Sequence, residues 1–152
     1  MTDEAKLRTA AEAGDVRAMI DLADLLLPQY EEAPERLAEA ESWFRRAAGT
    51  GDAEAMTAFG QFLYYDDEHD EAAEWYRKAA DLGHAEAMAG LGDYYDFMGD
   101  EEESERWYRR GAELGDESAK SNLAALESMR RRSAESASSA GDRPESGHRP
   151  GA

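Results

Sequence analysis

Histidines and clustered acids are the side chains of this 152-residue sequence that could support catalysis or metal binding. The three histidines, His69, His84 and His148, form neither an HExxH motif nor a pair one helical turn apart. The acidic run at 66–71 lacks the central Gly and closing Glu of a calcium loop, so we interpret it as a solvated turn. No G-x-S-x-G motif and no phosphate-binding loop occurs.

Cysteine is absent, which excludes thiolate metal sites, disulfides and cysteine nucleophiles and suits a reducing compartment. We therefore expect no enzymatic activity, no cofactor and no metal site. The net charge of −18 should repel nucleic acid. The apolar runs are too short to span a bilayer, and the acidic N-terminus does not look like a signal peptide. These features predict a cytoplasmic protein without membrane or nucleic-acid partners, monomeric by default.

Tryptophan and basic residues recur along the chain at a fixed interval. Trp43, Trp75 and Trp107 are each 32 residues apart, and a pair of basic residues follows each of them. The basic pairs could form an anion-binding ridge. However, glutamates precede one cation of each pair by four residues, which favours salt-bridged helix surface: Glu41–Arg45, Glu74–Lys78 and Glu105–Arg109. We interpret the tryptophans as packing residues, because a stacking site would not need three copies.

The elements that carry these residues should all be helices. The chain has 29 Ala but only Val16 and Ile20 as β-branched aliphatic residues. Gly occurs at 14, 51, 83 and 115 and is followed each time by Asp or His. The Gly is expected to end one helix and the next residue to cap the following helix. Apolar spacing predicts helix pairs at 53–65 with 70–82 and at 85–98 with 101–114, with capping helices at 3–13 and 117–130. The first repeat carries five extra residues, which we assign to a loop at 28–34.

Small residues occupy one position inside the first helix of each pair. They predict close approach of a neighbouring helix, because interior Gly otherwise costs about 1 kcal/mol: Ala23, Gly60, Gly92 and Ala124. We expect a repeat domain at 1–130. The Ser-, Arg-, Pro- and Gly-rich segment at 131–152 has no apolar period, so we expect a disordered tail.

The repeated motifs WYRKAA, G-(D/H)-A-E-A-M and Leu91-Gly92 resemble those of the Sel-like repeats, a branch of the tetratricopeptide-like solenoids. The resemblance covers roughly residues 5–129, although the 32-residue period is shorter than is usual in the family. It implies an all-α, right-handed α/α solenoid of about three helix pairs with capping helices. It also implies a role as an adaptor or scaffold that binds other proteins.

The resemblance further implies a concave groove lined by the first helix of each pair. Matching the Leu-Gly pair places partner-binding residues at Asp24, Thr57, Gln61, Tyr64, Tyr65, Asp93, Asp96 and Phe97. The same match places Arg17, Ile20, Leu27, Glu54, Glu86 and Ala89 on this face. Such a groove would be acidic and aromatic, which suits a basic or amphipathic segment. The alternative is that the aromatic residues complete the core and the acids are merely solvated.

Two functional interpretations remain open at this point. In the first, the protein is an interaction scaffold that binds a basic segment in its groove. In the second, it is an acidic inhibitor that neutralises a nucleic-acid-binding protein such as a nuclease through its overall charge.

Overall fold

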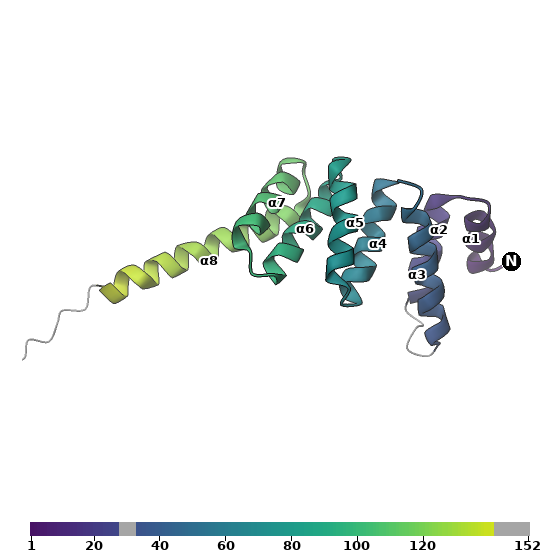
Figure 1. Ribbon diagram of the computed structural model, residues 1–152, viewed down its shortest axis with the longest axis horizontal. Coiled ribbons are helices and arrows are strands. Elements are labelled where there is room, and N and C mark those ends of the chain that lie inside the picture. The colour runs from purple at the N-terminus through teal and green to yellow at the C-terminus, as the bar shows by residue number, and fades with distance from the viewer. Residues whose placement is uncertain (28–32, 142–152) are drawn as a thin grey trace, which may run out of the picture.

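The computed structural model describes residues 1–27 and 33–141, and Figure 1 shows their helices side by side in a row. Within these residues the chain is all α-helical. The helices are α1 (Asp3–Glu12), α2 (Val16–Leu26), α3 (Pro34–Ala48), α4 (Ala53–Tyr65), α5 (His69–Asp81), α6 (Ala85–Phe97), α7 (Glu101–Glu113) and α8 (Glu117–Gly141). The predicted helix pairs are therefore α4 with α5 and α6 with α7, and their ends lie within one residue of the predicted ends.

Aspartate caps and left-handed glycines set the repeat boundaries. The side chains of Asp15, Asp52 and Asp116 accept hydrogen bonds from backbone N–H groups in the first turns of α2, α4 and α8. The glycines before these three caps and before His84 have φ between 84° and 98°, a conformation that other residues rarely adopt. His84, the residue before α6, makes no such side-chain bond, and its Nδ1 lies 2.9 Å from Thr57 Oγ1 on α4.

An aromatic ring inserted between two glycines joins successive repeats. Tyr76, on α5, is buried between Gly60 of α4 and Gly90 of α6. A Cβ at either glycine would lie 2.7–2.8 Å from ring atoms of Tyr76, closer than any ordinary van der Waals contact. Tyr108 covers Gly92 in the same way one repeat later. The predicted close approach of a neighbouring helix at Gly60 and Gly92 is thus confirmed.

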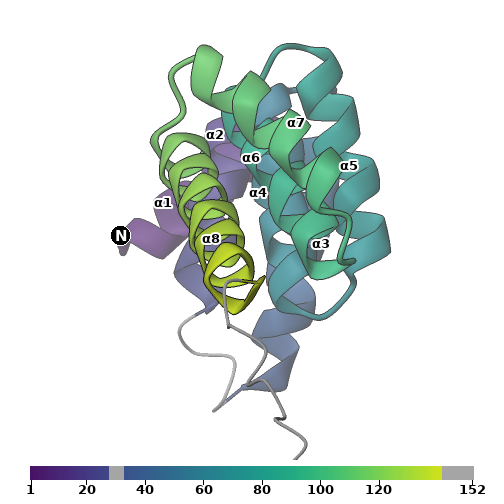
Figure 2. The same ribbon diagram turned by 90° about the vertical axis from the view of Figure 1, so that its left-hand side faces the viewer.

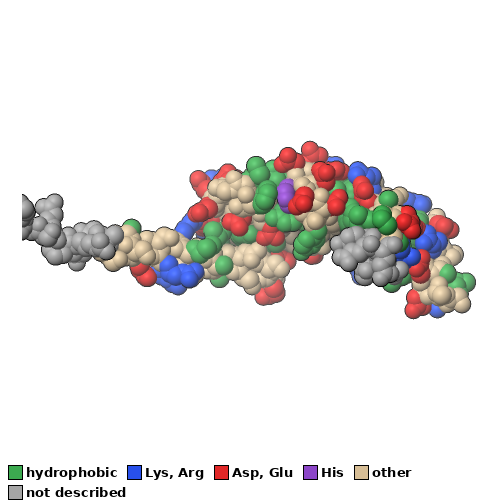
Figure 3. All heavy atoms as spheres, turned by 90° about the horizontal axis from the view of Figure 1, so that it is seen from below, with side chains coloured by type: hydrophobic (Ala, Val, Ile, Leu, Met, Phe, Trp, Pro, Cys, Tyr) green, Lys and Arg blue, Asp and Glu red, His purple; other side chains and the backbone are tan. Residues whose placement is uncertain are grey.

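The helices form an inner and an outer layer, and Figure 2 shows α3, α5 and α7 of the outer layer along one side of the row. Contacts join α2 to α4, α4 to α6 and α6 to α8, so these four helices form the inner layer. In the described part of the chain, the backbones of the outer helices α1, α3, α5 and α7 do not approach one another. The inner layer is therefore the tightly packed side of the row, and the body is arched when seen from below (Figure 3).

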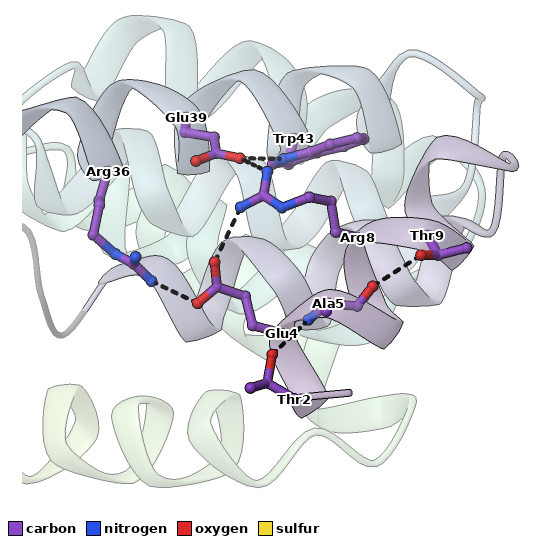
Figure 4. A network of polar contacts seen from close by, with 8 residues as sticks. All are labelled: Thr2, Glu4, Ala5, Arg8, Thr9, Arg36, Glu39 and Trp43. Atoms are coloured by element: carbon purple, nitrogen blue, oxygen red, sulfur yellow. Dashed lines mark hydrogen bonds and ion pairs between the residues drawn. The ribbon is translucent and has the colours of Figure 1, made fainter.

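Long charged side chains bridge the outer helices where their backbones do not touch (Figure 4). Glu4 of α1 accepts from Arg36 of α3 at 3.2 Å, and Arg8 of α1 donates to Glu39 of α3. Glu39 also accepts from the indole Nε1 of Trp43 at 3.3 Å. The same arrangement recurs at the next junction, where Glu71 of α5 accepts from Arg45 of α3 at 3.1 Å.

The predicted packing role of the tryptophans is confirmed, because all three are half-buried against the core. Of the predicted glutamate–cation pairs, Glu41–Arg45 and Glu105–Arg109 are present. Lys78 instead has its Nζ 4.0 Å from the centre of the Trp75 ring. In this repeat the cation therefore lies over the ring of Trp75, where it adds a modest favourable interaction.

Two expectations at irregular segments are wrong where the structure describes the residues. Pro34 was expected in a loop but opens α3 at its first turn, where the missing N–H costs nothing; residues 28–32 of that loop lie outside the described residues. Residues 131–141 were expected to belong to a disordered tail, yet they are the last turns of α8, which extends beyond the body in Figure 1. The rest of the expected tail, 142–152, lies outside the described residues.

We predict that Gly60→Ala destabilises the protein. Helix propensity alone would favour Ala by about 1 kcal/mol. The added methyl group would meet Tyr76 at 2.8 Å and the carbonyl oxygen of Ala72 at 3.3 Å. Overpacking of this kind costs about 1–3 kcal/mol, so urea unfolding should show a net loss of stability.

Ala124→Gly is the matched control, because Ala124 occupies the same repeat position on α8, where it is exposed. It should cost only about 1 kcal/mol from helix propensity. If Gly60→Ala raised the stability instead, Tyr76 would not constrain this position.

We also predict that a chain ending at Arg130 melts within about 2 °C of the full chain. The side chains described beyond Arg130 are exposed, and exposed positions contribute little to stability. Differential scanning calorimetry of the two chains measures this. A loss of cooperative melting would show that the end of α8 supports the body.

Candidate functional site

A polar pocket of about 190 Å³ lies on the inner layer, between α4 and α6. Six residues predicted for the groove line it: Gln61, Tyr64, Tyr65, Glu86, Ala89 and Asp93. Tyr76, Gly90 and Ser118 complete the lining, and sequence reasoning did not place them there. The pocket lies where Tyr76 passes between the two inner helices, so the same close approach that joins the repeats also shapes it.

Asp93 is the half-buried carboxylate of this pocket. Its Oδ1 accepts two hydrogen bonds, from the Tyr108 hydroxyl at 2.6 Å and from Asn122 Nδ2 at 2.9 Å. Its Oδ2 has no donor among the described residues, and it is not fully buried. Burial raises the pKa of Asp93 above its ordinary value, although the two hydrogen bonds act in the opposite direction. Asp93 therefore has one oxygen committed to the fold and one available.

Aromatic rings gather beside the pocket, at the turn between α4 and α5. The His69 ring lies between Tyr64, 4.7 Å away, and Phe97, 4.3 Å away between ring centroids. Phe97 and Tyr65 are 59% and 87% exposed, so these two rings lie outside the core, whereas Tyr64 is half-buried against it. The sequence did not predict His69 as part of this cluster. Its ring contacts Phe97 of the next repeat, so the cluster joins two repeats.

A second, apolar pocket of about 290 Å³ adjoins Tyr65 on its other side. It is lined by Leu27, Leu37, Phe62, Tyr65 and Asp66. Tyr65 therefore stands between a polar pocket and an apolar one. In the space-filling view of Figure 3, hydrophobic patches alternate with acidic ones over this part of the body.

One predicted groove position is not accessible. Thr57 is only 2% exposed, and its hydroxyl bonds to the Ala53 carbonyl and to His84, so it is not available to a partner. The equivalent residues Ile20 and Ala89 are buried as well. The reason is that successive inner helices contact one another, so the groove floor closes at this position. Asp24 and Asp96 are exposed, as expected for a groove face, but they line neither pocket.

Negative charge is unevenly compensated along the inner layer. On α2, Arg17 pairs with Asp21 at 3.0 Å and with Glu54 of α4. On α6, Glu86 accepts only from the neutral Gln61 amide, at 2.6 Å, among the described residues. Asp93 likewise receives neutral donors there. Among the described residues, the groove acids without an ion pair are therefore Asp24 on α2 and Glu86, Asp93 and Asp96 on α6.

Residues 85–114 match the tetratricopeptide repeat family, which is about one repeat of this chain. None of the curated proteins is significantly similar to the chain in sequence. Over the described residues, no helix is both long and apolar enough to cross a membrane.

Several solved structures resemble the chain. A protective antigen of uropathogenic Escherichia coli with an SLR fold is 29% identical over 81% of this chain, with a TM-score of 0.66. The chain spans only 28% of that protein's length. A Sel1 repeat protein from Oxalobacter formigenes is 28% identical over 82% of this chain and 99% of its own, with a TM-score of 0.59. The Sgt2 TPR domain from Aspergillus fumigatus shares the fold at 20% identity, covering 86% of this chain and 90% of its own, with a TM-score of 0.56.

We predict that Asp93→Asn does not destabilise the protein at neutral pH. The pKa of Asp93 is raised on folding, so its contribution to stability is largest below the unfolded pKa and is lost as pH rises through the folded pKa. At neutral pH the buried charge is a cost, and Asn keeps an Oδ1 acceptor for Tyr108 and Asn122. The melting temperature should be equal or higher at neutral pH, and this advantage should vanish near the ordinary carboxyl pKa of about 4.

Glu74→Gln, an exposed acid on α5, removes the same charge away from Asp93 and serves as the control, so it should melt at the same temperature as the unmodified chain at neutral pH. A clear loss of melting temperature in Asp93→Asn at neutral pH would mean that the ionised carboxylate stabilises the fold.

Proposed function

Since the chain is built of Sel-like repeats of the tetratricopeptide type, we propose that it is an interaction scaffold that binds a basic, amphipathic protein segment in its inner groove. The observation that carries this proposal is the position of Tyr65 between a polar, acidic pocket and an apolar one. A segment that alternates cationic and apolar side chains could occupy both pockets at once.

The distribution of charge supports a basic partner. Asp21 of α2 and Glu54 of α4 have a cation in Arg17, whereas Glu86 and Asp93 on α6 have only neutral donors among the described residues. A basic segment would supply the missing charge, and the chain's net charge of −18 would speed its approach. The same charge disfavours nucleic acid as a partner. The absence of cysteine suits a cytoplasmic setting for this interaction.

The exposed aromatic residues support a localised site. Tyr65 and Phe97 present large apolar surfaces beside the acids, and aromatic side chains are frequent anchors at the centre of interfaces. A protein that acted by bulk negative charge would have no need of them. The acidic-inhibitor interpretation therefore remains the outcome that the experiment must separate from groove binding.

We predict that reversing two acids on α6 weakens binding of a basic amphipathic helical peptide by at least about tenfold. The variant is Glu86→Lys with Asp96→Lys, both exposed, so stability should change little. The peptide, rich in Lys and Leu, is titrated by fluorescence anisotropy, and its footprint is mapped by hydrogen exchange. Protection should concentrate on α4 and α6.

The matched control reverses Glu74 and Glu113, which are exposed on the outer helices α5 and α7 and form no ion pair with another described residue. It changes the net charge by the same amount and should leave the affinity within about twofold, as expected for charges away from the contact. Equal losses in both variants would favour the bulk-charge inhibitor and refute the groove.

A further inference from the structure

We propose that the polar pocket between α4 and α6 is an anchor for a single arginine or lysine side chain, held by Asp93 Oδ2 and the Tyr76 hydroxyl against the ring of Tyr64. This inference rests on the proposed function and names the chemical group of the partner that the groove would bind.

Tyr76 supplies the strongest evidence for a ligand. It is only 4% exposed and lines the pocket, yet its hydroxyl has no hydrogen-bond partner among the described residues. That oxygen is not fully enclosed, since it is not among the buried unpartnered polar atoms. Tyr108, one repeat later, shows what such a hydroxyl ordinarily does, because it donates to Asp93 Oδ1 at 2.6 Å.

Comparison of equivalent positions in the repeats shows why the Tyr76 hydroxyl has no hydrogen-bond partner. Gln61 occupies the position of Asp93 one repeat earlier, but its Nε2 is turned to Glu86 at 2.6 Å. In the first repeat the tyrosine position is Phe44, which has no hydroxyl at all. The fold therefore does not need a hydroxyl at this position, and Tyr76 has one that the protein leaves unused.

Asp93 supplies the charge. Its Oδ1 is filled by Tyr108 and Asn122, and its Oδ2 has no donor among the described residues. A partly buried carboxylate that receives only neutral donors gains most from a cation. Burial and the charge of Asp93 also raise the pKa of Tyr76, so its hydroxyl stays neutral and can accept a hydrogen bond from a cationic donor.

The pocket favours a cationic side chain over a metal ion. No three His, Asp or Glu side chains converge on a metal site in the part of the chain that the structure describes. The ring of Tyr64 borders the pocket, and burial together with the charge of Asp93 raises the pKa of Tyr64. An aromatic wall beside a carboxylate suits a guanidinium or ammonium group with an alkyl stem.

The test uses the full chain and the blocked peptide acetyl-Gly-Arg-Gly-amide, followed by NMR titration. The unmodified chain should show saturable shifts at the amides of Gly90 and Asp93. The lysine peptide should bind at the same place, and the citrulline peptide, which keeps the shape but has no charge, should bind at least about tenfold more weakly.

Two variants probe the two contacts without removing structural bonds. Asp93→Asn keeps the Oδ1 acceptor and should weaken the arginine peptide at least about tenfold, as for loss of a charge-assisted bond. Tyr76→Phe, which has a precedent in Phe44, should weaken it about three- to tenfold, as for a neutral hydrogen bond. Glu74→Gln changes the net charge as Asp93→Asn does and should leave binding unchanged.

The outcomes separate the anchor from the groove. Equal binding of the arginine and citrulline peptides, or undiminished binding to Asp93→Asn, would overturn the anchor. If the amphipathic peptide still bound the inner face in that case, the proposed function would survive. If neither peptide bound the inner face, both would fail.

Discussion

The insertion of one aromatic ring between two small residues is the constraint on which the rest of the structure depends. Tyr76 fits between Gly60 and Gly90 only because neither has a side chain. This contact brings α4, α5 and α6 together and sets the spacing of the inner layer. The polar pocket is a consequence of this contact, because Tyr76 also lines the surface pocket between α4 and α6.

Most of the fold follows from periodic features of the sequence. The glycine before each cap, the aspartate that caps and the tryptophan that packs recur in register, so helix ends could be predicted to within about one residue. The extent of α8 could not. Residues 131–141 have the polar composition of an unpacked segment, and their described side chains are exposed, so no packing pattern distinguishes helix from coil there.

The candidate site was predictable as a face but not as a set of contacts. The match to the family's Leu-Gly pair placed Gln61, Tyr64 and Asp93 on one surface, because neighbouring repeats share the same orientation. It could not show that Thr57 is covered, since that depends on how closely α4 and α6 approach. Nor could it reveal the two bonds on Asp93 Oδ1, whose donors lie 15 and 29 residues further along the chain.

The outer ion pairs have a mechanical consequence. Inner helices are held by close packing, whereas outer helices are linked by Arg8–Glu39, Arg36–Glu4 and Arg45–Glu71. Partly exposed ion pairs of this kind are each worth about 0–1 kcal/mol and weaken as salt is added. The inner layer should therefore resist deformation more strongly than the outer layer when the row of helices bends. The bending stiffness of the row would fall with ionic strength, and its radius of curvature could adjust to the width of whatever the groove holds.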